Sequence, residues 1–470
     1  MSTSAHRIRR LRWNARATSA ADAFALRGLL RERGDEIAAA LERALGEVPV
    51  GGDVVRLGRL ELRLEATSLD ALSADFGRAI EDAARASVRL ALRDATRSSS
   101  STNPSVEARR QRPAAARRDS LRHYLRTGAL DWTLAGLAIE DATQALRGAA
   151  EEVVGRGALA ALLDGLETPA HRIGAVLRWW RLLPAARRRA WMDSAAPLDS
   201  SARVMAALAA LRQNLDVDMT PSNAPLLALW LAWPTQQDAS TAHLWRRSAV
   251  EWLVSHEPLP AAVRPLVHAL REEIAAHATP VAPDARPVVP PASEPEAADT
   301  AMLVPLAGMV LLHPYLPRLL AACGLVDTAT SRTLSPAAMP RACALLHWLA
   351  TGRDDIAEYE LPLIKLLLGG APDAPLDLAP TAPSEADRAE SSALLATVPT
   401  HWTGLRGTGT DGLRLSFLQR RGLLARSDGG WTLRMQPEAF DLLLSTLPWA
   451  IGLIRLPWMP QALRVEWEGT

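Results

Sequence analysis

Hydrophobic and polar positions change between strand spacing and helical spacing in the first part of the chain. The alternating run over residues 8–13 predicts a strand. Residues 24–45 then repeat apolar side chains every three or four positions, which predicts a helix. Thr18 or Ser19 is suited to cap this helix, and Gly46 is suited to end it.

A second strand and a second helix follow. Residues 54–65, VVRLGRLELRLE, alternate in hydrophobicity and predict a strand with a bulge at Gly58. Residues 69–92 again show helical spacing. We therefore predict a small β-α-β-α unit over residues 5–95, in which the helices cover one face of a small sheet.

The composition changes over residues 97–118, which contain serine, arginine and two prolines and almost no apolar residue. This composition predicts a flexible linker. An arm that contacts a phosphate backbone is the alternative, but no aromatic residue lies between the arginines to stack on bases. These arginines are Arg109, Arg110, Arg112, Arg117 and Arg118.

Helical spacing dominates residues 119–278, where Gly and Pro occur often enough to give helices of about 10 to 20 residues. No fixed repeat period is present, so the spacing predicts a helical array rather than a solenoid. Residues 279–300 are rich in proline and predict a stiff, extended linker.

Residues 301–470 predict a mostly helical domain. A predicted helix over residues 413–420 is followed by two apolar residues, the turn SDGG and the strand WTLRM, an order that is typical of the wing in a winged helix. The apolar region after it ends in an alternating, strand-like run. The predicted fold class is therefore mainly α, with a wing-like β-hairpin and a terminal strand in this domain.

Composition and charge exclude several classes of protein. The 53 basic and 52 acidic residues give a net charge of +1, so no overall excess attracts nucleic acid or a membrane surface. Cys323 and Cys343 lie in apolar runs, which predicts small buried side chains rather than a disulfide framework or a zinc site. The charged start lacks the apolar stretch of a secretory signal, so we expect the protein in the cytoplasm.

One glycine-rich loop matches a nucleotide-binding pattern. Gly407, Gly409 and Gly412 in GTGTDG have the spacing G-x-G-x-x-G, but no buried strand and no βαβ unit precede them. The context favours a loop that ends in a cap at Thr410 or Asp411. With the wing-like hairpin, this loop leaves a nucleotide- or DNA-binding regulator as the alternative function. The basic residues next to the hairpin are Arg414, Arg420 and Arg421.

Side chains with catalytic potential have structural explanations. His313 and His347 lie between apolar residues, as hydrogen-bonded core histidines do. An acidic cluster after Gly352 could bind a cation, but it is more typical of a solvated turn. No common catalytic motif occurs, so we predict a protein that is not an enzyme and that has no cofactor and no metal site. The acidic cluster comprises Asp354, Asp355, Glu358 and Glu360.

Residues 439–467, which we call the C-terminal segment, combine tryptophans, aliphatic residues and three prolines. The segment is too interrupted to span a membrane and must be buried in this protein or against a partner. Because Trp and Arg are enriched at interface hot spots, we name candidate partner-binding residues in it, while burial of Trp449 and Trp458 in the core stays open as the alternative. The candidates are Trp449, Arg455, Trp458 and Trp467.

The strings LAGMVLLHPYLPRLLAACGLVD, EYELPLIKLLLG and IRLPWMP with a downstream VEW occur in this order over residues 303–467. In order and spacing they resemble the C-terminal region of the tape measure proteins of contractile injection systems, the phage-tail-like particles of bacteria. The N-terminal unit and LRHYLRTGALDW are also similar to that family. The chain has Gly369 and Gly370 where the family is expected to have Cys-Gly.

The resemblance implies a structural assembly protein that is threaded through the growing inner tube, helps to set its length, and contacts inner-tube and baseplate or spike proteins. It implies no small-molecule substrate, no nucleic acid and no membrane as partners, and it leaves a homo-oligomer in the particle open. A fully helical chain of this length would extend about 700 Å. The proline-rich linker and the folded ends predict that the chain is not one continuous helix.

Overall fold

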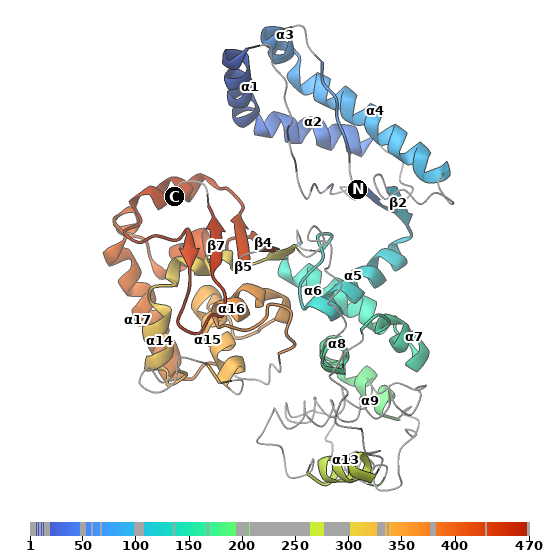
Figure 1. Ribbon diagram of the computed structural model, residues 1–470, viewed down its shortest axis with the longest axis vertical. Helices are drawn as coiled ribbons and strands as arrows, with labels where there is room; N and C mark the ends of the chain where they lie inside the picture. The colour runs from blue at the N-terminus through green and yellow to red at the C-terminus, as the bar shows by residue number, and fades with distance from the viewer. Residues whose placement is uncertain are drawn as a thin grey trace, which may run out of the picture. The chain divides into compact units, whose positions relative to one another are not determined.

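The computed structural model describes residues 6, 8, 11, 13, 19–47, 53–57, 60–65, 68–97, 108–134, 137–166, 169–193, 206, 264–276, 301–326, 334–335, 338–376, 382–427 and 430–467. Contacts divide the chain into two compact units, unit 1 (Met1–Asp119) and unit 2 (Ser120–Thr470). The finer division into five parts stays a prediction. The described residues are mainly α-helical, which confirms the predicted fold class (Figure 1).

Each of the two predicted helices in unit 1 is broken once. Ser19 caps the first helix through its side chain, as predicted, and Gly46 ends the second. At the first break, the guanidinium of Arg33 donates to the carbonyl and hydroxyl oxygens of Ser73, at 2.7 and 2.9 Å, and so ties the break to the next helix pair. The helices are α1 (Ala20–Glu32), α2 (Gly34–Gly46), α3 (Leu69–Ala74) and α4 (Phe76–Arg97).

The core of unit 1 forms where α2 packs against α4. Alanines at the contact let the two helices approach closely, and Phe76 fills the space at one end. Beside the helices, β1 (Val54–Leu57) pairs antiparallel with β2 (Ala108–Gln111). The buried core residues are Ile37, Ala40, Leu41, Ala44, Phe76, Ile80 and Ala84.

Three predictions for unit 1 are corrected by the structure. The strand predicted over residues 54–65 is limited to β1, and residues 60–65 lie outside any strand. Ile8, Leu11 and Trp13 lie outside any strand, and Trp13 packs against the helical core instead. The stretch 97–118, which we predicted to be a flexible linker, contains β2 and the start of α5 (Pro113–Thr127) in its described part. The order is therefore helix pair, strand, helix pair, strand. The second strand, β2, pairs with β1. The predicted bulge at Gly58 lies outside the described residues.

The described helices of unit 2 fall into two groups along the sequence. The first group contains helices predicted over residues 119–193, whereas the prediction for residues 194–263 lies outside the described residues except at Ala206. The predicted linker 279–300 also lies outside them. The first group comprises α5, α6 (Ile139–Glu151), α7 (Gly155–Leu162), α8 (Pro169–Leu182), α9 (Ala185–Asp193) and α13 (Arg264–Ala276).

The second group of helices belongs to the C-terminal half of unit 2 (Figure 1). It contains short 3₁₀ helices, named η, between longer α-helices, and one π-helical turn, η6. These elements are η2 (Ala307–Leu312), α14 (Leu316–Ala322), α15 (Met339–Thr351), η4 (Glu358–Glu360), α16 (Pro362–Leu367), α17 (Glu385–His401), η5 (Thr403–Leu405), α18 (Thr410–Leu413), η6 (Arg414–Leu418) and η7 (Ala439–Thr446).

Five strands of the described residues form one sheet in the order β3-β4-β5-β7-β6. β4 (Gly422–Ser427) and β5 (Gly430–Met435) form the predicted hairpin, and β7 (Leu463–Glu466) is the predicted terminal strand. β3 (Met302–Val304) pairs antiparallel with β4, β7 pairs parallel with β5, and β6 (Leu453–Ile454) pairs antiparallel with β7. The hairpin therefore lies inside a sheet and does not project as a wing.

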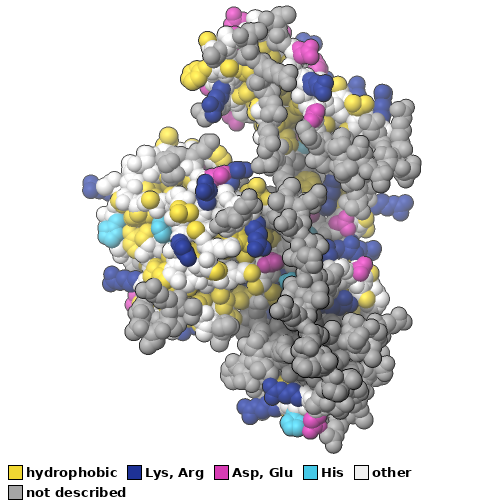
Figure 2. Space-filling view, in the orientation of Figure 1, with side chains coloured by type: hydrophobic (Ala, Val, Ile, Leu, Met, Phe, Trp, Pro, Cys, Tyr) yellow, Lys and Arg dark blue, Asp and Glu magenta, His cyan; other side chains and the backbone are white. Residues whose placement is uncertain are grey.

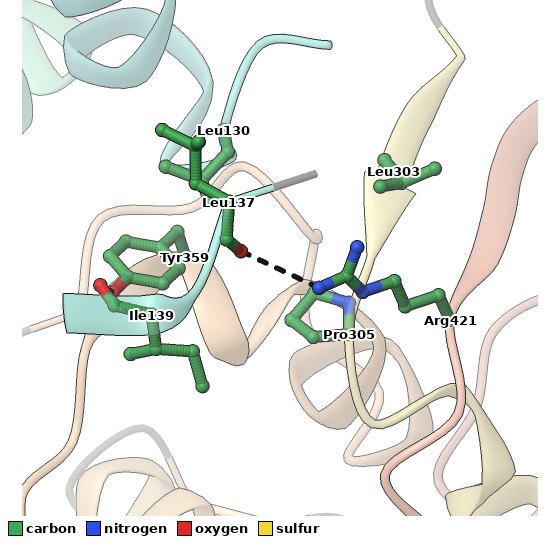
Figure 3. Close-up of a pocket in the computed structure, with 7 residues that line it drawn as sticks. All are labelled: Leu130, Leu137, Ile139, Leu303, Pro305, Tyr359 and Arg421. Carbon is green, nitrogen blue, oxygen red and sulfur yellow. Dashed lines mark hydrogen bonds between the residues drawn. The ribbon is translucent and has the colours of Figure 1, made fainter. Parts of the chain in front are cut away.

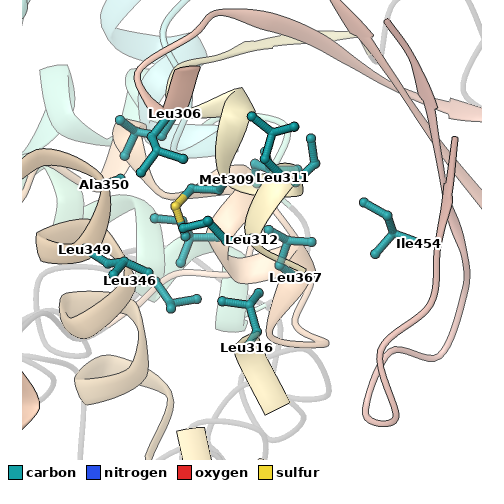
Figure 4. Close-up of a cluster of buried hydrophobic side chains, with 14 of the residues drawn as sticks. Leu306, Met309, Leu311, Leu312, Leu316, Leu346, Leu349, Ala350, Leu367 and Ile454 are labelled. Atoms are coloured by element: carbon teal, nitrogen blue, oxygen red, sulfur yellow. The ribbon is translucent and has the colours of Figure 1, made fainter. Parts of the chain in front are cut away.

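One hydrophobic core joins the helices and the sheet of this half. Figure 4 shows side chains of η2 and α14 pointing toward those of α15 and α16, with Ile454 of β6 beside them. The approach is closest at Gly308, where a Cβ atom would lie 1.5 Å from the carbonyl oxygen of Phe417, so η2 and η6 pack backbone to backbone only with glycine there. Cys323 and Cys343 are free and buried, as predicted.

Candidate functional site

Two tryptophans of the C-terminal segment belong to the core of unit 2. The indole N–H of Trp458 donates to the carbonyl oxygen of Leu367 at 2.7 Å, and the side chain is 8% exposed. Trp467 is 4% exposed, and the guanidinium of Arg420 lies 5.5 Å from its ring centroid. Both side chains therefore fix the path of the segment across the domain.

The other two candidate residues are more accessible. Trp449 is half-buried; its indole N–H donates to the carbonyl oxygen of Leu311 at 3.0 Å, and its ring meets Tyr315 edge-on at 5.4 Å. Arg455 is exposed. Of the four candidate residues, the structure thus leaves Arg455 exposed and Trp449 accessible in part.

Large apolar side chains of the same segment are exposed. Phe440 is 52% exposed and Leu442 is 82% exposed, both on η7, and Leu453 on β6 is 66% exposed. On the face of unit 2 that Figure 2 shows, hydrophobic side chains lie in separate groups between basic ones. The composition of the segment pointed to its tryptophans, two of which are buried in the core, and did not single out these exposed apolar side chains.

A buried ion cluster lies where the first helical group meets the C-terminal half of unit 2. It consists of Arg178, Glu358 and Lys365, each less than 5% exposed. The carboxylate oxygen Oε1 of Glu358 accepts from Nη2 of Arg178 and from Nζ of Lys365, both at 2.8 Å. Burial opposes the charge on Glu358, but Arg178 and Lys365 outweigh it and lower its pKa to about 2. The cluster is closed to solvent and its cations are paired, which suits a structural role.

The ion cluster overturns part of the prediction for the acidic residues after Gly352. Asp354 and Asp355 are exposed, as in a solvated turn, but Glu358 and Glu360 are buried. The prediction failed because one of the two partners of Glu358, Arg178, is far away in sequence. A signal was present: Lys365 is the single charge in the apolar run LPLIKLLLG, and Arg178 lies between apolar residues in RIGAVLRWWRLL.

Glu360 takes part in a second buried group. It accepts a hydrogen bond from the ring of His347 at 3.1 Å and pairs with Arg353. His347 is fully buried, which confirms the prediction of a hydrogen-bonded core histidine. His313 is half-buried, and its Nδ1 lies 3.0 Å from the carbonyl oxygen of Val310.

The glycine-rich loop does not have the geometry of a phosphate-binding loop. It follows the short helix η5 instead of a strand, and the helix after it, α18, has four residues. Gly409 precedes α18 without a side-chain cap, so the predicted cap at Thr410 or Asp411 is wrong.

The arginines next to the hairpin are engaged within the protein. Arg414 donates to the carbonyl oxygens of Trp348 and Leu349, and Arg420 is buried against Asp441. Arg421 is exposed. The alternative of a nucleotide- or DNA-binding regulator therefore gains no support from this geometry.

A small pocket of about 40 Å³ lies near the same junction (Figure 3). Its walls are mostly apolar. The polar groups at its edge have protein partners: the hydroxyl of Tyr359 bonds Thr143 and Ile139, and Arg421 reaches the carbonyl oxygen of Leu137 at 3.5 Å. The pocket offers no set of convergent polar groups for a ligand. It is lined by Leu130, Leu137, Ile139, Leu303, Pro305, Tyr359 and Arg421.

Two general features of the described residues bear on function. They contain no group of three or more His, Cys, Asp or Glu side chains that could hold a metal ion. In the same part of the chain, no helix is both long enough and apolar enough to span a membrane.

Comparison with known proteins gives one match. A family described as contractile injection system tape measure protein matches residues 5–467, nearly the whole chain. No match is found among curated proteins or among solved structures.

Proposed function

Because the chain belongs to the family of contractile injection system tape measure proteins, we propose that it helps to set the length of the inner tube and that its C-terminal segment anchors it to baseplate or spike components. The family match over residues 5–467 carries the first part of the proposal. The exposed side chains of the C-terminal segment support the second part.

The anchoring surface that we propose combines apolar and basic side chains. Phe440, Leu442 and Leu453 supply the apolar area, and Arg455 supplies a cation that suits an acidic site on the partner. Trp449 contributes its accessible edge. Trp458 and Trp467 act indirectly, because their burial holds the segment in place.

The proposal gives the chain a structural role without catalysis, cofactor or small-molecule substrate. Its partners are inner-tube and baseplate or spike proteins, and neither nucleic acid nor a membrane is among them. We place it in the cytoplasm, where the particle would assemble, and a homo-oligomeric state in the particle fits the proposal equally well.

Deletion of residues 200–260 in the producing strain tests the role in tube length. A ruler that spans 1.5 Å per residue along a helix would lose about 90 Å with these residues, so electron micrographs should show shorter tubes. A duplication of the same residues should lengthen the tubes by a similar amount. Unchanged tube length in both strains would remove the ruler role and leave the anchoring role to be tested separately.

A further inference from the structure

We infer that the described residues of 120–193 are a fixed part of unit 2, locked to its C-terminal half by the buried ion cluster, and that they lie outside the part of the chain that sets tube length. Only the statement about tube length rests on the proposed function. The statement that the ion cluster holds these residues in place concerns the folded protein and can be tested without particles.

Arg178 is the centre of the lock. From α8 it reaches three separate segments of unit 2: Nη2 donates to Glu358 of η4 at 2.8 Å and to the carbonyl oxygen of Asp373 at 2.8 Å, and Nη1 donates to the carbonyl oxygen of Leu125 in α5 at 2.8 Å. Lys365 completes the arrangement, since its Nζ donates to the carbonyl oxygen of Ala374 at 2.7 Å as well as to Glu358.

Further contacts extend the junction on both sides of the ion cluster. The hydroxyl groups of Tyr359 and Thr143 lie 2.6 Å apart, and Tyr359 meets Tyr124 edge-on at 6.2 Å. Arg181 donates to the carbonyl oxygen of Leu376 at 2.8 Å. Helices α5, α6 and α8 are therefore all attached to the same region, residues 358–376.

The backbone is fitted to the ion cluster at one point. Gly128 has φ +68°, and a Cβ atom there would lie 2.8 Å from Nη2 of Arg178 and 3.1 Å from Oε1 of Glu358. The end of α5 thus approaches the ion pair as closely as a residue without a side chain allows.

Physical chemistry favours a junction that is either fully closed or fully open. A partial separation would leave buried charges without their partners, which is costly, whereas the closed state satisfies them in one register. If residues 120–193 were to extend along a tube, all of these contacts would have to break together.

The single lysine of the chain provides a direct test. Lys365 is the one lysine in the sequence, and it is 1% exposed. An amine-reactive ester therefore reports opening of the junction in the full chain. Mass spectrometry measures the rate at which the ester modifies Lys365. We expect modification roughly 100-fold slower than in the urea-unfolded chain, because the amine is reached only through opening. Equal rates in the two states would overturn the inference.

Two glycine variants form a matched pair that leaves the charges themselves unaltered. Gly128→Ala and Gly155→Ala both place alanine at positive φ, but the added Cβ atom at Gly155 would meet no other part of the described protein within 4 Å. Gly128→Ala should speed modification of Lys365 several-fold, while Gly155→Ala should leave it slow. The same rate in both variants would contradict a lock at this point.

Two deletions, each tested in the purified protein and in the particle-producing strain, distinguish this inference from the proposed function. Deletion of residues 200–260 should leave Lys365 slow to react, and deletion of residues 139–182 should make it react rapidly without a proportional shortening of the tube. A deletion of residues 139–182 that shortens the tube in proportion and keeps Lys365 protected would overturn the inference. If neither deletion changes tube length, the ruler role fails, and the labelling of Lys365 still decides whether the junction is fixed.

Discussion

Glu358 is a carboxylate that is enclosed by protein and nevertheless held in its charged form. Two cations balance it, Arg178 from α8 and Lys365 from α16. The charges lose their hydration when they are buried, so the arrangement is favourable only while all of them stay paired. Its energy also depends on pH.

Glu358→Gln is expected to remove part of the acid sensitivity of unit 2. Burial opposes the charge of Glu358, but its cationic partners lower its pKa from 4.5 to about 2. The ionised group therefore stabilises the fold above about pH 4.5, and this stabilisation is lost as the pH falls toward 2. The loss amounts to about 3 kcal/mol. Urea unfolding of both proteins, followed by tryptophan fluorescence between about pH 5 and pH 2, measures it.

The expected result is a stability difference between wild type and Glu358→Gln that shrinks as the pH falls. Asp355→Asn is the matched control, because Asp355 is exposed, and its curve should follow the wild type. Asp387 and Asp441 also have lowered pKa values, since bonds from Arg341 and Arg420 outweigh their burial, but they contribute equally to all three proteins. Parallel curves for wild type and Glu358→Gln would contradict the role given to the carboxylate.

At the scale of single residues, sequence patterns correctly predicted the burial of side chains whose environment is decided by their neighbours in sequence. Cys343 and His347 lie in the apolar helix α15, and both are buried as predicted. Trp458 could be core or surface by pattern alone, and the structure buries it. The burial of Glu358 could not be predicted from its polar neighbours, because Arg178 comes from another part of the chain.

Among the elements, α15 shows how a side chain first considered for nucleic acid serves the fold. The helix ends at Gly352 with φ +72°, which leaves carbonyl groups of its last turn without helical partners. Arg414 of η6 donates to the carbonyl oxygen of Leu349 at 3.1 Å and to that of Trp348 at 3.3 Å. Its guanidinium also lies 5.0 Å from the centroid of the Trp348 ring.

Arg414→Met is therefore expected to destabilise unit 2 by about 1–2 kcal/mol, because the end of α15 loses a charged donor. Arg406→Met, which changes an exposed arginine nearby, should alter stability by less than about 0.5 kcal/mol. Urea unfolding at neutral pH compares the two variants. A silent Arg414→Met would show that the contact contributes nothing and would return this arginine to the candidates for binding.

Elements with local signals were predicted well, and their neighbours were not. The hairpin β4–β5 follows from two apolar runs around SDGG, and it is confirmed. Its partners β3 and β7 are a short run far upstream and a strand beyond η7, so the pattern of the hairpin could not indicate that both of its edges are covered. The break at Arg33 escaped prediction as well, and the bond that its guanidinium makes there reaches Ser73, far away in sequence.

For the whole molecule, the main distinction lies between residues that hold the C-terminal segment and residues that it presents. Trp458 is fixed by a hydrogen bond and by packing, whereas Leu453 has no such burial. Stability and particle assembly should therefore respond to different substitutions in the same segment. Comparing substitutions of the two kinds therefore tests the anchoring proposal directly.

Trp458→Ala is expected to destabilise the full chain by about 3–5 kcal/mol, as for other buried tryptophans. Leu453→Asp should leave stability unchanged within about 0.5 kcal/mol and reduce the number of complete particles, because it places a charge in the proposed anchoring surface. Unfolding curves and particle counts from micrographs give the two measurements. Normal particle numbers with Leu453→Asp, Leu442→Asp and Arg455→Glu would exclude this surface as the anchor.

The sheet of unit 2 has a consequence for the synthesis of the protein. β7 lies between β5 and β6, so residues 463–466 fill an interior position although they are translated well after the hairpin. Until the ribosome has released them, β5 exposes an unpaired edge, and such edges promote aggregation. A premature stop codon between Gln436 and Ala462 would make that exposure permanent. We therefore expect truncated chains to accumulate in inclusion bodies or bound to chaperones.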